Sequence, residues 1–283
     1  MKTVAITGAT SGIGLEAARA LAGEGYRVLC VGRCEENCEK ARLSIAASAP
    51  QASVRFFAAD LMQQRETLRL AREIGECLDR ESGGRLDALV CNAGCARSRY
   101  MTTQEGYEQQ FALNYLSAFL LAHALLPQLK AAGGRLILTG SGSHRGARVH
   151  WDDVMLRKRY NPLTAYKQSK LCGLLFAREF NARYAACGVR AYVVDPGLVN
   201  TDIGDKAGGV VRAVWRFRKR HGAPPAVPAR TFLFLCGQEP APQGIYYRLC
   251  KEQRYSRRVT EQDGRRLFAL SERLCGLSKG GAL

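Results

Sequence analysis

The sequence predicts an α/β fold in which a doubly wound parallel sheet of about seven strands carries helices on both faces. Short apolar runs alternate with longer segments of helical periodicity along the chain, the pattern of repeated strand–helix–strand units. The predicted strands are nearly continuous apolar runs, as expected for parallel strands buried on both faces. No internal repeat or low-complexity linker interrupts this pattern, so we interpret residues 1–283 as one domain.

The elements follow one another in a regular order. The first strand leads into a glycine-rich turn and then a helix that ends at Gly25, because glycine is a common helix stop. The Pro-rich stretch 224–228 is expected to join two helices. The predicted strands are 4–6, 27–31, 54–58, 86–91, 135–138, 189–194 and 245–247. The predicted helices are 13–24, 35–47, 64–81, 103–131, 164–186, 210–220, 229–235 and 263–275.

Composition and charge exclude several classes of protein. Apolar residues make up 47% of the chain and charged residues 24%, which is close to a globular average and excludes a disordered or collagen-like chain. The 42 Lys and Arg residues exceed the 25 Asp and Glu residues, giving a net charge of +17. That excess allows anionic partners such as a phosphorylated ligand, nucleic acid or an acidic membrane surface.

The cysteines and apolar runs predict a cytoplasmic location. Eleven scattered cysteines fit no small disulfide framework, so free thiols in a reducing compartment are expected. The first residues do not form a signal peptide, because their apolar stretch is too short. No run reaches the roughly 18 apolar residues of a membrane span, and we interpret the nearest, 111–129, as a buried helix.

A glycine-rich turn follows the first strand and opens the first helix. It reads Thr-Gly-Ala-Thr-Ser-Gly-Ile-Gly from Thr7 to Gly14. Glycine allows a sharp turn and a close approach to a pyrophosphate, and the helix N-terminus then offers free N–H groups. By itself this turn is weak support for nucleotide binding, since its spacing is not the common dinucleotide fingerprint. Its place in an alternating chain favours nucleotide binding over a purely structural turn.

The end of the second strand predicts which nucleotide binds. An acidic residue there would hold the ribose hydroxyls of NAD, and a basic one the 2′-phosphate of NADP. Here Arg33 follows Gly32, and no carboxylate appears before Glu35. Because arginine can bind phosphate through two hydrogen bonds, we expect NADP(H) to be preferred over NAD(H). The alternative is a solvated arginine on a basic protein.

A tyrosine and a lysine form a candidate acid–base pair. Tyr166 and Lys170 are four residues apart, so both side chains lie on one face of the predicted helix. A free tyrosine has a pKa of about 10, and a nearby ammonium group lowers that pKa by favouring the phenolate. The pair is therefore suited to proton transfer, although alone it occurs often by chance.

Further polar motifs follow the predicted strands. Asn92-Ala93-Gly94 ends the fourth strand, Ser141 follows the fifth, and Asp195-Pro196-Gly197 follows the sixth. The carboxyl ends of parallel strands share one edge of the sheet, which is where ligands bind in open α/β folds. Asn114 approaches that edge from a helix.

Taken together, these motifs resemble the short-chain dehydrogenase/reductase family of classical type. The matching pieces stand in the family's order and span most of the chain: Thr7 to Gly14, Asp60-Leu61, Asn92-Ala93-Gly94, Asn114, Ser141, Tyr166 with Lys170, and Pro196-Gly197 with Thr201. Within the family the chain is most similar to the retinol dehydrogenase-like branch. That similarity rests on 141–145 and its spacing to Tyr166, on Tyr160-Asn161, and on the tail from Gly244 to Leu277.

The resemblance implies a single NAD(P)-binding Rossmann domain with a substrate lid near 202–228. It implies that Tyr166 exchanges a proton with the substrate oxygen, that Ser141 hydrogen-bonds that oxygen, and that Asn114 holds a water linked to Lys170. Lys170 would also bind the nicotinamide ribose. The implied cofactor-binding residues are Gly8, Ser11, Gly12, Ile13, Gly14, Arg33, Asp60, Leu61, Asn92, Gly94, Tyr166, Lys170, Pro196, Gly197 and Thr201.

Two departures from the family pattern affect the assignment. The family often has asparagine before Asn92, where this chain has Cys91, a small change at a strand end. Ser143 lies two residues after Ser141 and is an alternative catalytic serine. We favour Ser141 because its spacing to Tyr166 matches the branch.

The spaced cysteines, the histidines and a basic segment do not by themselves indicate a further site. Cys30, Cys34 and Cys38 recur every fourth residue, but they fall on different elements, so no metal site is predicted. The histidines show no metal-binding pattern either. His144 follows the candidate serine, and one interpretation places it at the mouth of the substrate site. The segment 210–220 is basic and amphipathic, so it is either a solvated part of the lid or a peripheral contact with an acidic membrane.

The resulting prediction is an oxidoreductase, a carbonyl reductase that uses NADPH on a small lipophilic aldehyde or ketone and runs reversibly as an alcohol dehydrogenase. A retinoid-like aldehyde and an unrelated bacterial or xenobiotic carbonyl both remain open as substrates. The alternative is a non-catalytic NAD(P)-binding sensor or scaffold. Nucleic-acid binding rests on charge alone and is not expected. A homo-oligomer paired through helices 103–131 and 164–186 is consistent with the resemblance.

Overall fold

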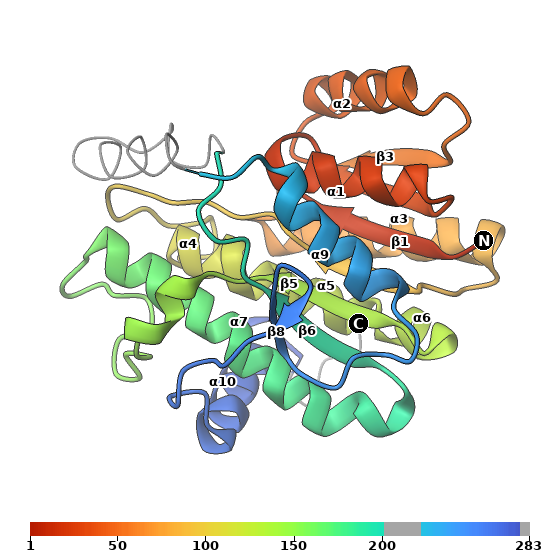
Figure 1. Ribbon diagram of the computed structural model, residues 1–283. Coiled ribbons are helices and arrows are strands. Elements are labelled where there is room, and N and C mark those ends of the chain that lie inside the picture. Colours follow the sequence, from red (N-terminus) through yellow and green to blue (C-terminus); the bar gives the residue numbers. More distant parts are fainter. Residues whose placement is uncertain (201–221, 278–283) are drawn as a thin grey trace.

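The computed structural model describes residues 1–200 and 222–277, and its centre is one sheet in the order β3-β2-β1-β4-β5-β6-β7-β8 (Figure 1). Strands β1 to β7 are parallel, and the short edge strand β8 is antiparallel to β7. The strands are β1 Thr3–Thr7, β2 Arg27–Gly32, β3 Val54–Ala58, β4 Ala88–Cys91, β5 Arg135–Thr139, β6 Arg190–Val194, β7 Tyr246–Arg248 and β8 Lys251–Glu252. This confirms the doubly wound α/β fold, with one strand that the sequence did not predict.

Helices cover both faces of this sheet (Figure 1). They are α1 Gly12–Gly23, α2 Glu35–Ser48, α3 Gln64–Ser82, α4 Gln109–Phe111, α5 Ser117–Ala124, α6 Leu126–Ala132, α7 Pro162–Tyr184, α9 Ala226–Gly237 and α10 Glu261–Leu274. Three shorter turns of helix are η1 Ala112–Leu116, η2 Gly142–Gly146 and η3 Ala185–Cys187. Helices α1 and α9 pack against each other on one face, and α7 packs against α10 on the other.

The two faces arise from the period-two alternation of strand side chains. In β1, Ala5 points into the core under α3, α5 and α7, whereas Val4 and Ile6 point into the core under α1 and α9. All three are fully buried. Because both faces of β1 are covered, its sequence has no polar alternation, which explains the continuous apolar run.

The predicted helix 103–131 is wrong as a single element. Helix begins only at Gln109, passes through the π-helical turn η1, and breaks between α5 and α6, whose axes differ by 64°. Pro127 lies in the first turn of α6. Proline lacks an N–H group and its ring clashes with the carbonyl four residues earlier, so a continuous helix cannot pass through it.

No single helix in 1–200 or 222–277 is long and apolar enough to span a membrane. The bent pair Gln109–Ala124 and Leu126–Ala132 passes that test together, by length and composition only.

Three predictions fall on residues outside the described ranges. They are the contact made by Thr201, the basic helix 210–220, and most of the lid 202–228.

Candidate active site

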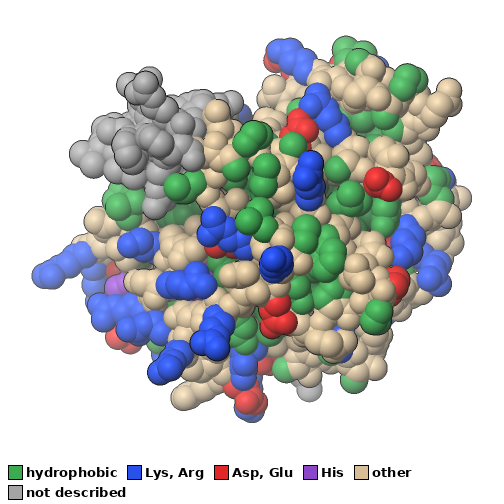
Figure 2. Space-filling view, in the orientation of Figure 1, with side chains coloured by type: hydrophobic (Ala, Val, Ile, Leu, Met, Phe, Trp, Pro, Cys, Tyr) green, Lys and Arg blue, Asp and Glu red, His purple; other side chains and the backbone are tan. Residues whose placement is uncertain are grey.

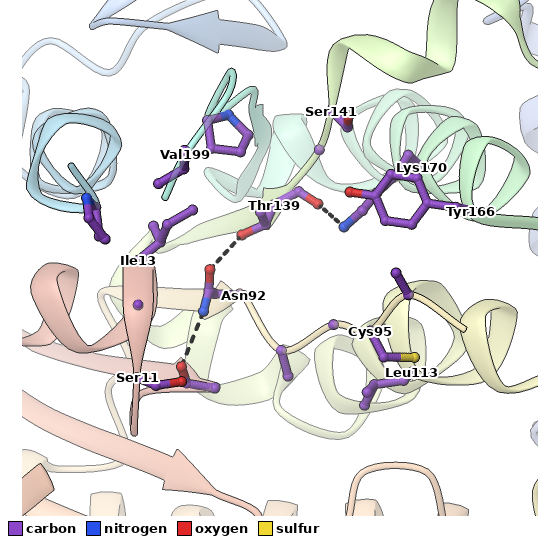
Figure 3. A pocket seen from close by; sticks show the side chains of 18 of the residues that line it. Ser11, Ile13, Asn92, Cys95, Leu113, Thr139, Ser141, Tyr166, Lys170 and Val199 are labelled. Atoms are coloured by element: carbon purple, nitrogen blue, oxygen red, sulfur yellow. Dashed lines mark hydrogen bonds between the residues drawn. The ribbon is translucent and has the colours of Figure 1, made fainter. Parts of the chain in front are cut away.

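A cleft of about 940 Å³ opens where the parallel strands β1, β2, β4, β5 and β6 end at their carboxyl termini. Predicted site residues from all of these strand ends line it, together with Tyr166 and Lys170 of α7 (Figure 3). Of the predicted residues that the structure describes, Gly14 and Asn114 are the two that lie behind the wall of the cleft. The fold therefore brings together motifs that are up to about two hundred residues apart, as expected for the carboxyl edge of an open α/β sheet.

The glycine turn is tightly constrained by its neighbours. Gly8 has φ +67°, and a Cβ atom there would lie 2.9 Å from Cα of Ala93. A Cβ atom on Gly14 would lie 2.1 Å from the carbonyl oxygen of Gly8. Ser11 is the N-cap of α1 and its side chain accepts no capping hydrogen bond. The first N–H groups of α1 therefore face the cleft, and this arrangement fits a bound pyrophosphate.

The side chain of Asn92 holds the glycine turn in place through hydrogen bonds. Its amide nitrogen donates to the carbonyl oxygens of Thr7 and Gly8, both at 3.3 Å. Its amide oxygen accepts from the hydroxyl of Thr139 at 3.1 Å (Figure 3). The Asn92 side chain thus joins the ends of β1, β4 and β5. Its predicted position beside the adenosine ribose stays a prediction.

Arg33 marks the end of the cleft that would hold the adenosine half of a dinucleotide. It directly follows β2, it is exposed, and it lines the cleft with Asn37 and Asp60. Within residues 1–200 and 222–277 it forms no ion pair. Asp60 accepts a hydrogen bond from the backbone N–H of Met62 at 3.2 Å, which shapes the wall containing Leu61. The guanidinium of Arg33 is thus available for a phosphate.

Tyr166 and Lys170 lie on the wall opposite the glycine turn (Figure 3). The Nζ atom of Lys170 lies 5.7 Å from the centre of the Tyr166 ring and donates a hydrogen bond to the carbonyl oxygen of Thr139 at 2.9 Å. Only 4% of Lys170 is exposed, and this burial lowers its pKa to about 8. A buried ammonium group beside a phenol favours the phenolate, so the pair can exchange a proton near neutral pH.

Both candidate serines line the cleft. Ser141 follows β5 as the N-cap of η2, and its Oγ accepts from the backbone N–H of Ser143 at 3.3 Å. The Oγ atoms of the two serines are 3.0 Å apart, with Ser143 as donor. Because Ser143 donates its proton to Ser141, the hydroxyl proton of Ser141 is the one left for a ligand. The choice of Ser141 stays a prediction that this geometry favours.

His144 lies behind this wall and not at the substrate mouth. Its side chain is fully buried. Its Nδ1 atom lies 2.8 Å from the carbonyl oxygen of Ser141, and its Nε2 atom accepts from the backbone N–H of Ser256 at 3.2 Å. Burial lowers the pKa of His144, so the ring is neutral near pH 7 and Nδ1 carries the proton. His144 ties the wall that carries the two serines to the segment after β8.

The Pro196-Gly197 turn is fixed by a buried carboxylate. Asp195 accepts from the backbone N–H of Gly197 at 2.9 Å and from the hydroxyl of Tyr246 at 2.7 Å. Burial and this carboxylate raise the pKa of Tyr246, so its hydroxyl stays a donor. Gly197 has φ +71°, a conformation that favours glycine.

Asn114 lies in the π-helical turn η1. Its amide oxygen accepts from the backbone N–H of Cys95 at 2.7 Å, and its amide nitrogen donates to the Cys95 carbonyl and to the Ser169 hydroxyl, both at 3.0 Å. A Cβ atom on Gly94 would lie 3.0 Å from Oδ1 of Asn114 and 3.8 Å from Nζ of Lys170. The asparagine is therefore close to Lys170 but held behind Gly94. A π-helical turn at this place is typical of functional sites.

Several residues that line the cleft were missed by the sequence reasoning. Thr139 and Arg248 end strands β5 and β7, so the rule that ligands bind at carboxyl strand ends identifies them in principle. Thr10 lies in the glycine turn and was overlooked there, whereas Asn37 and Arg97 lie in a first helical turn and a loop, where the sequence carries no such signal. Among the missed residues are Thr10, Asn37, Arg97, Thr139 and Arg248.

The cysteines give no metal site. Within the described part of the chain, no group of three or more His, Cys, Asp or Glu side chains is placed to hold a metal ion. Cys91 and Cys95 beside the cleft are buried, and burial raises the pKa of Cys91 to about 12 and that of Cys95 to about 11. Both thiols therefore stay protonated and unreactive at neutral pH.

Comparison with known proteins identifies the family. The family model described as short chain dehydrogenase matches residues 2–209. Mouse retinol dehydrogenase 13 is 32% identical over 287 residues, which cover 98% of this chain and 84% of that protein. Human retinol dehydrogenase 14 is 31% identical over 298 residues, covering 98% and 87%.

A solved structure of an uncharacterised protein from Mycobacterium paratuberculosis has the same fold. Its TM-score is 0.75 with 27% identity, and the match covers 98% of this chain and 94% of that one. Proteins of the matching family bind a nicotinamide cofactor and act on small alcohols and carbonyl compounds. The chain belongs to the short-chain dehydrogenase/reductase family and, within it, to the retinol dehydrogenase-like branch.

Proposed function

We propose that the protein is an NADPH-dependent reductase of the carbonyl group of a small lipophilic aldehyde or ketone, which also oxidises the corresponding alcohol. The observation that carries this proposal is the convergence of Ser141, Tyr166 and Lys170 on one wall of a cleft whose far end exposes Arg33. For carbonyl chemistry, Ser141 supplies a hydrogen-bond donor, Tyr166 an acid and Lys170 a cation. The arginine supplies a partner for the 2′-phosphate.

In this mechanism the chain orients the carbonyl and provides the proton. The Ser141 hydroxyl donates a hydrogen bond to the carbonyl oxygen, and the Tyr166 hydroxyl gives that oxygen a proton as the carbon is reduced. A nicotinamide cofactor held by Lys170 and the glycine turn would supply the hydride for the carbon. The Lys170 ammonium stabilises the phenolate left on Tyr166, and solvent then returns the proton.

The walls near the catalytic residues support a lipophilic substrate. Apolar side chains reach the cleft from η1 and from the chain after β6, namely Leu113, Leu198 and Val199. Leu198 is 46% exposed, so it presents an apolar surface at the rim. Apolar walls with a few convergent polar groups are typical of small-molecule sites.

Replacement of the acid tests the proposal directly. We expect Tyr166→Phe to lower kcat for carbonyl reduction about 10²- to 10⁴-fold, the usual contribution of a positioned acid or base. Binding of NADPH, followed by fluorescence, should be largely retained, because the substitution removes only one of the many predicted contacts of the cofactor. Full activity in this variant would remove Tyr166 from the mechanism. No activity in the wild type with any carbonyl would instead favour a non-catalytic sensor.

A further inference from the structure

We propose that Arg248 forms an anion-binding subsite at the mouth of the candidate active site, which takes a carboxylate of the substrate or a phosphate of the cofactor. The substrate arm of this proposal rests on the proposed function, whereas binding of the anion itself does not.

The topology of the sheet places Arg248 at the edge of the site. Strand β7 is parallel to β6, so its carboxyl end lies at the same edge of the sheet as the Pro196-Gly197 turn. Tyr246 and Arg248 are two residues apart in β7 and point to the same face. The hydroxyl of Tyr246 binds Asp195, and Arg248 lines the cleft one step further along. Arg248 therefore belongs to the wall made by the ends of β6 and β7.

The guanidinium lies directly against Gly197. A Cβ atom on Gly197 would lie 2.9 Å from Nη2, 3.2 Å from Cζ and 3.3 Å from Nε of Arg248. Any other residue at this position would displace the arginine. The glycine of the turn thus makes room for a cation at the edge of the cleft, in addition to allowing its positive φ.

No acidic side chain in 1–200 or 222–277 forms an ion pair with Arg248. The two carboxylate oxygens of Asp195, at the end of β6, accept hydrogen bonds from Gly197 and from Tyr246. Glu252 pairs across the hairpin with Tyr247 and so falls on the opposite face of β7. Among the described residues, then, no carboxylate neutralises Arg248, and its charge can serve a ligand.

The surroundings of Arg248 also attract anions. Figure 2 shows Lys and Arg side chains gathered on the middle and lower left of the face that carries β7 and β8 in Figure 1. Arg145 lies 5.8 Å from the centre of the Tyr246 ring, and its guanidinium donates to the backbone of Arg254. A basic rim raises the local concentration of anionic ligands and their rate of association.

The first experiment measures binding without turnover. Para-formylbenzoate and its methyl ester are titrated by calorimetry into the NADP⁺ complex, which cannot reduce them. The wild type should bind the carboxylate more tightly than Arg248→Gln does, by about tenfold, the order of one hydrogen bond to a charged group. The ester should bind equally to both. Arg248→Lys should recover part of the difference because it keeps the charge. Lys251→Gln, in the same hairpin but outside the cleft, should behave as the wild type.

A second arm identifies the source of the anion. If Arg248→Gln weakens NADPH binding about tenfold and leaves the carboxylate preference unchanged, the anion is the phosphate of the cofactor. If it weakens only the carboxylate, the anion belongs to the substrate. Equal binding of every ligand by wild type and Arg248→Gln would overturn the subsite. A protein that binds the anion but reduces no carbonyl would keep the subsite and refute the proposed function.

Discussion

At the scale of single residues, the site depends on two cationic side chains, Lys170 and Arg33, which form no ion pair within the described part of the chain. Lys170 is buried beside Tyr166 with a backbone carbonyl as its acceptor, and Arg33 is exposed at the other end of the cleft. A buried cation costs folding free energy, whereas an exposed arginine costs little. The two residues therefore call for different tests: one of stability and one of ligand selectivity.

Arg33 should select the cofactor. We expect Arg33→Ala to raise the dissociation constant for NADPH about tenfold to a hundredfold, since a hydrogen bond to a charged group contributes about 1.5–3 kcal/mol. The dissociation constant for NADH should be nearly unchanged, because NADH lacks the 2′-phosphate. Fluorescence titration measures both values. Arg42→Ala in α2 is the control, since Arg42 already pairs with Glu39. Equal loss of both cofactors in Arg33→Ala would refute this role.

Lys170 should make the stability of the cofactor-free protein depend on pH. Burial lowers its pKa from 10.5 to about 8. Between these values the unfolded chain binds more protons than the folded protein, so the free energy of unfolding rises with pH across this window. Urea unfolding of the wild type and of Lys170→Met measures that slope, and the variant should lose this contribution while being inactive.

The control for this pH dependence lies on the same helix. Lys167 is only partly buried, so Lys167→Met should keep the wild-type slope. An equal slope in wild type and Lys170→Met would show that Lys170 is not the group that titrates.

At the scale of elements, the catalytic wall is held from behind by a segment that is distant in sequence. His144 in η2 bridges the carbonyl of Ser141 and the backbone N–H of Ser256, and its ring packs edge-on against Tyr246 at 5.0 Å. Tyr246 in turn holds Asp195 at the end of β6. The walls formed after β5 and β6 therefore share support from β7 and from the segment after β8.

Replacing His144 should disturb this wall. His144→Phe removes the hydrogen bonds that the ring makes with the Ser141 carbonyl and the Ser256 N–H. The Ser141 carbonyl keeps its bond from the backbone N–H of residue 144, so the main cost is the lost partner of the Ser256 N–H, about 1–3 kcal/mol. We expect a lower Tm and a lower kcat. His144→Gln offers one donor and one acceptor and should recover most of both. Steady-state kinetics and thermal unfolding measure the effect. A glutamine variant as impaired as the phenylalanine variant would argue against the bridging role.

The breaks in the helix region 103–131 also belong to this scale. Period-based reasoning joined α4, η1, α5 and α6 because most of their residues are apolar and α5 is almost wholly buried, which hides where one helix stops. Pro127 was a visible signal for the break before α6. The π-helical turn that places Asn114 had no such signal, because it depends on contacts of Asn114 with Cys95 and Ser169.

At the scale of the whole molecule, one cleft joins the two halves of the sheet, so a ligand that fills it should stabilise the entire domain. At a concentration of NADPH about one hundred times its dissociation constant, linkage predicts about 2.7 kcal/mol of stabilisation. For a domain of this size, Tm should rise by about 5–10 °C.

Thermal unfolding with equal concentrations of NADPH and NADH measures this effect. The shift should be larger with NADPH, and Arg33→Ala should make the two shifts equal. A larger shift with NADH would reverse the cofactor preference, although the fold would stand.

The sequence by itself determined the order of strands and helices, because each parallel strand must bury both faces and each helix one. Residues 54–58 were predicted as a strand with the bounds of β3, and six other strands were placed within two residues. It also placed Asn92, Ser141 and Asp195 at one edge, since parallel strands all end there. Tyr166 and Lys170 were paired by their spacing on a helix, and only the fold brings that helix to this edge.

Only the tertiary structure decided which side chains line the cleft and which support it. The side chains of Asn92 and His144 form hydrogen bonds that hold neighbouring segments together. The guanidinium of Arg248, by contrast, lines the cleft beside Gly197. These outcomes depend on distances between strands that are far apart in sequence. Local periodicity carries no information about such distances, because they are set by how the two helix layers and the sheet pack together.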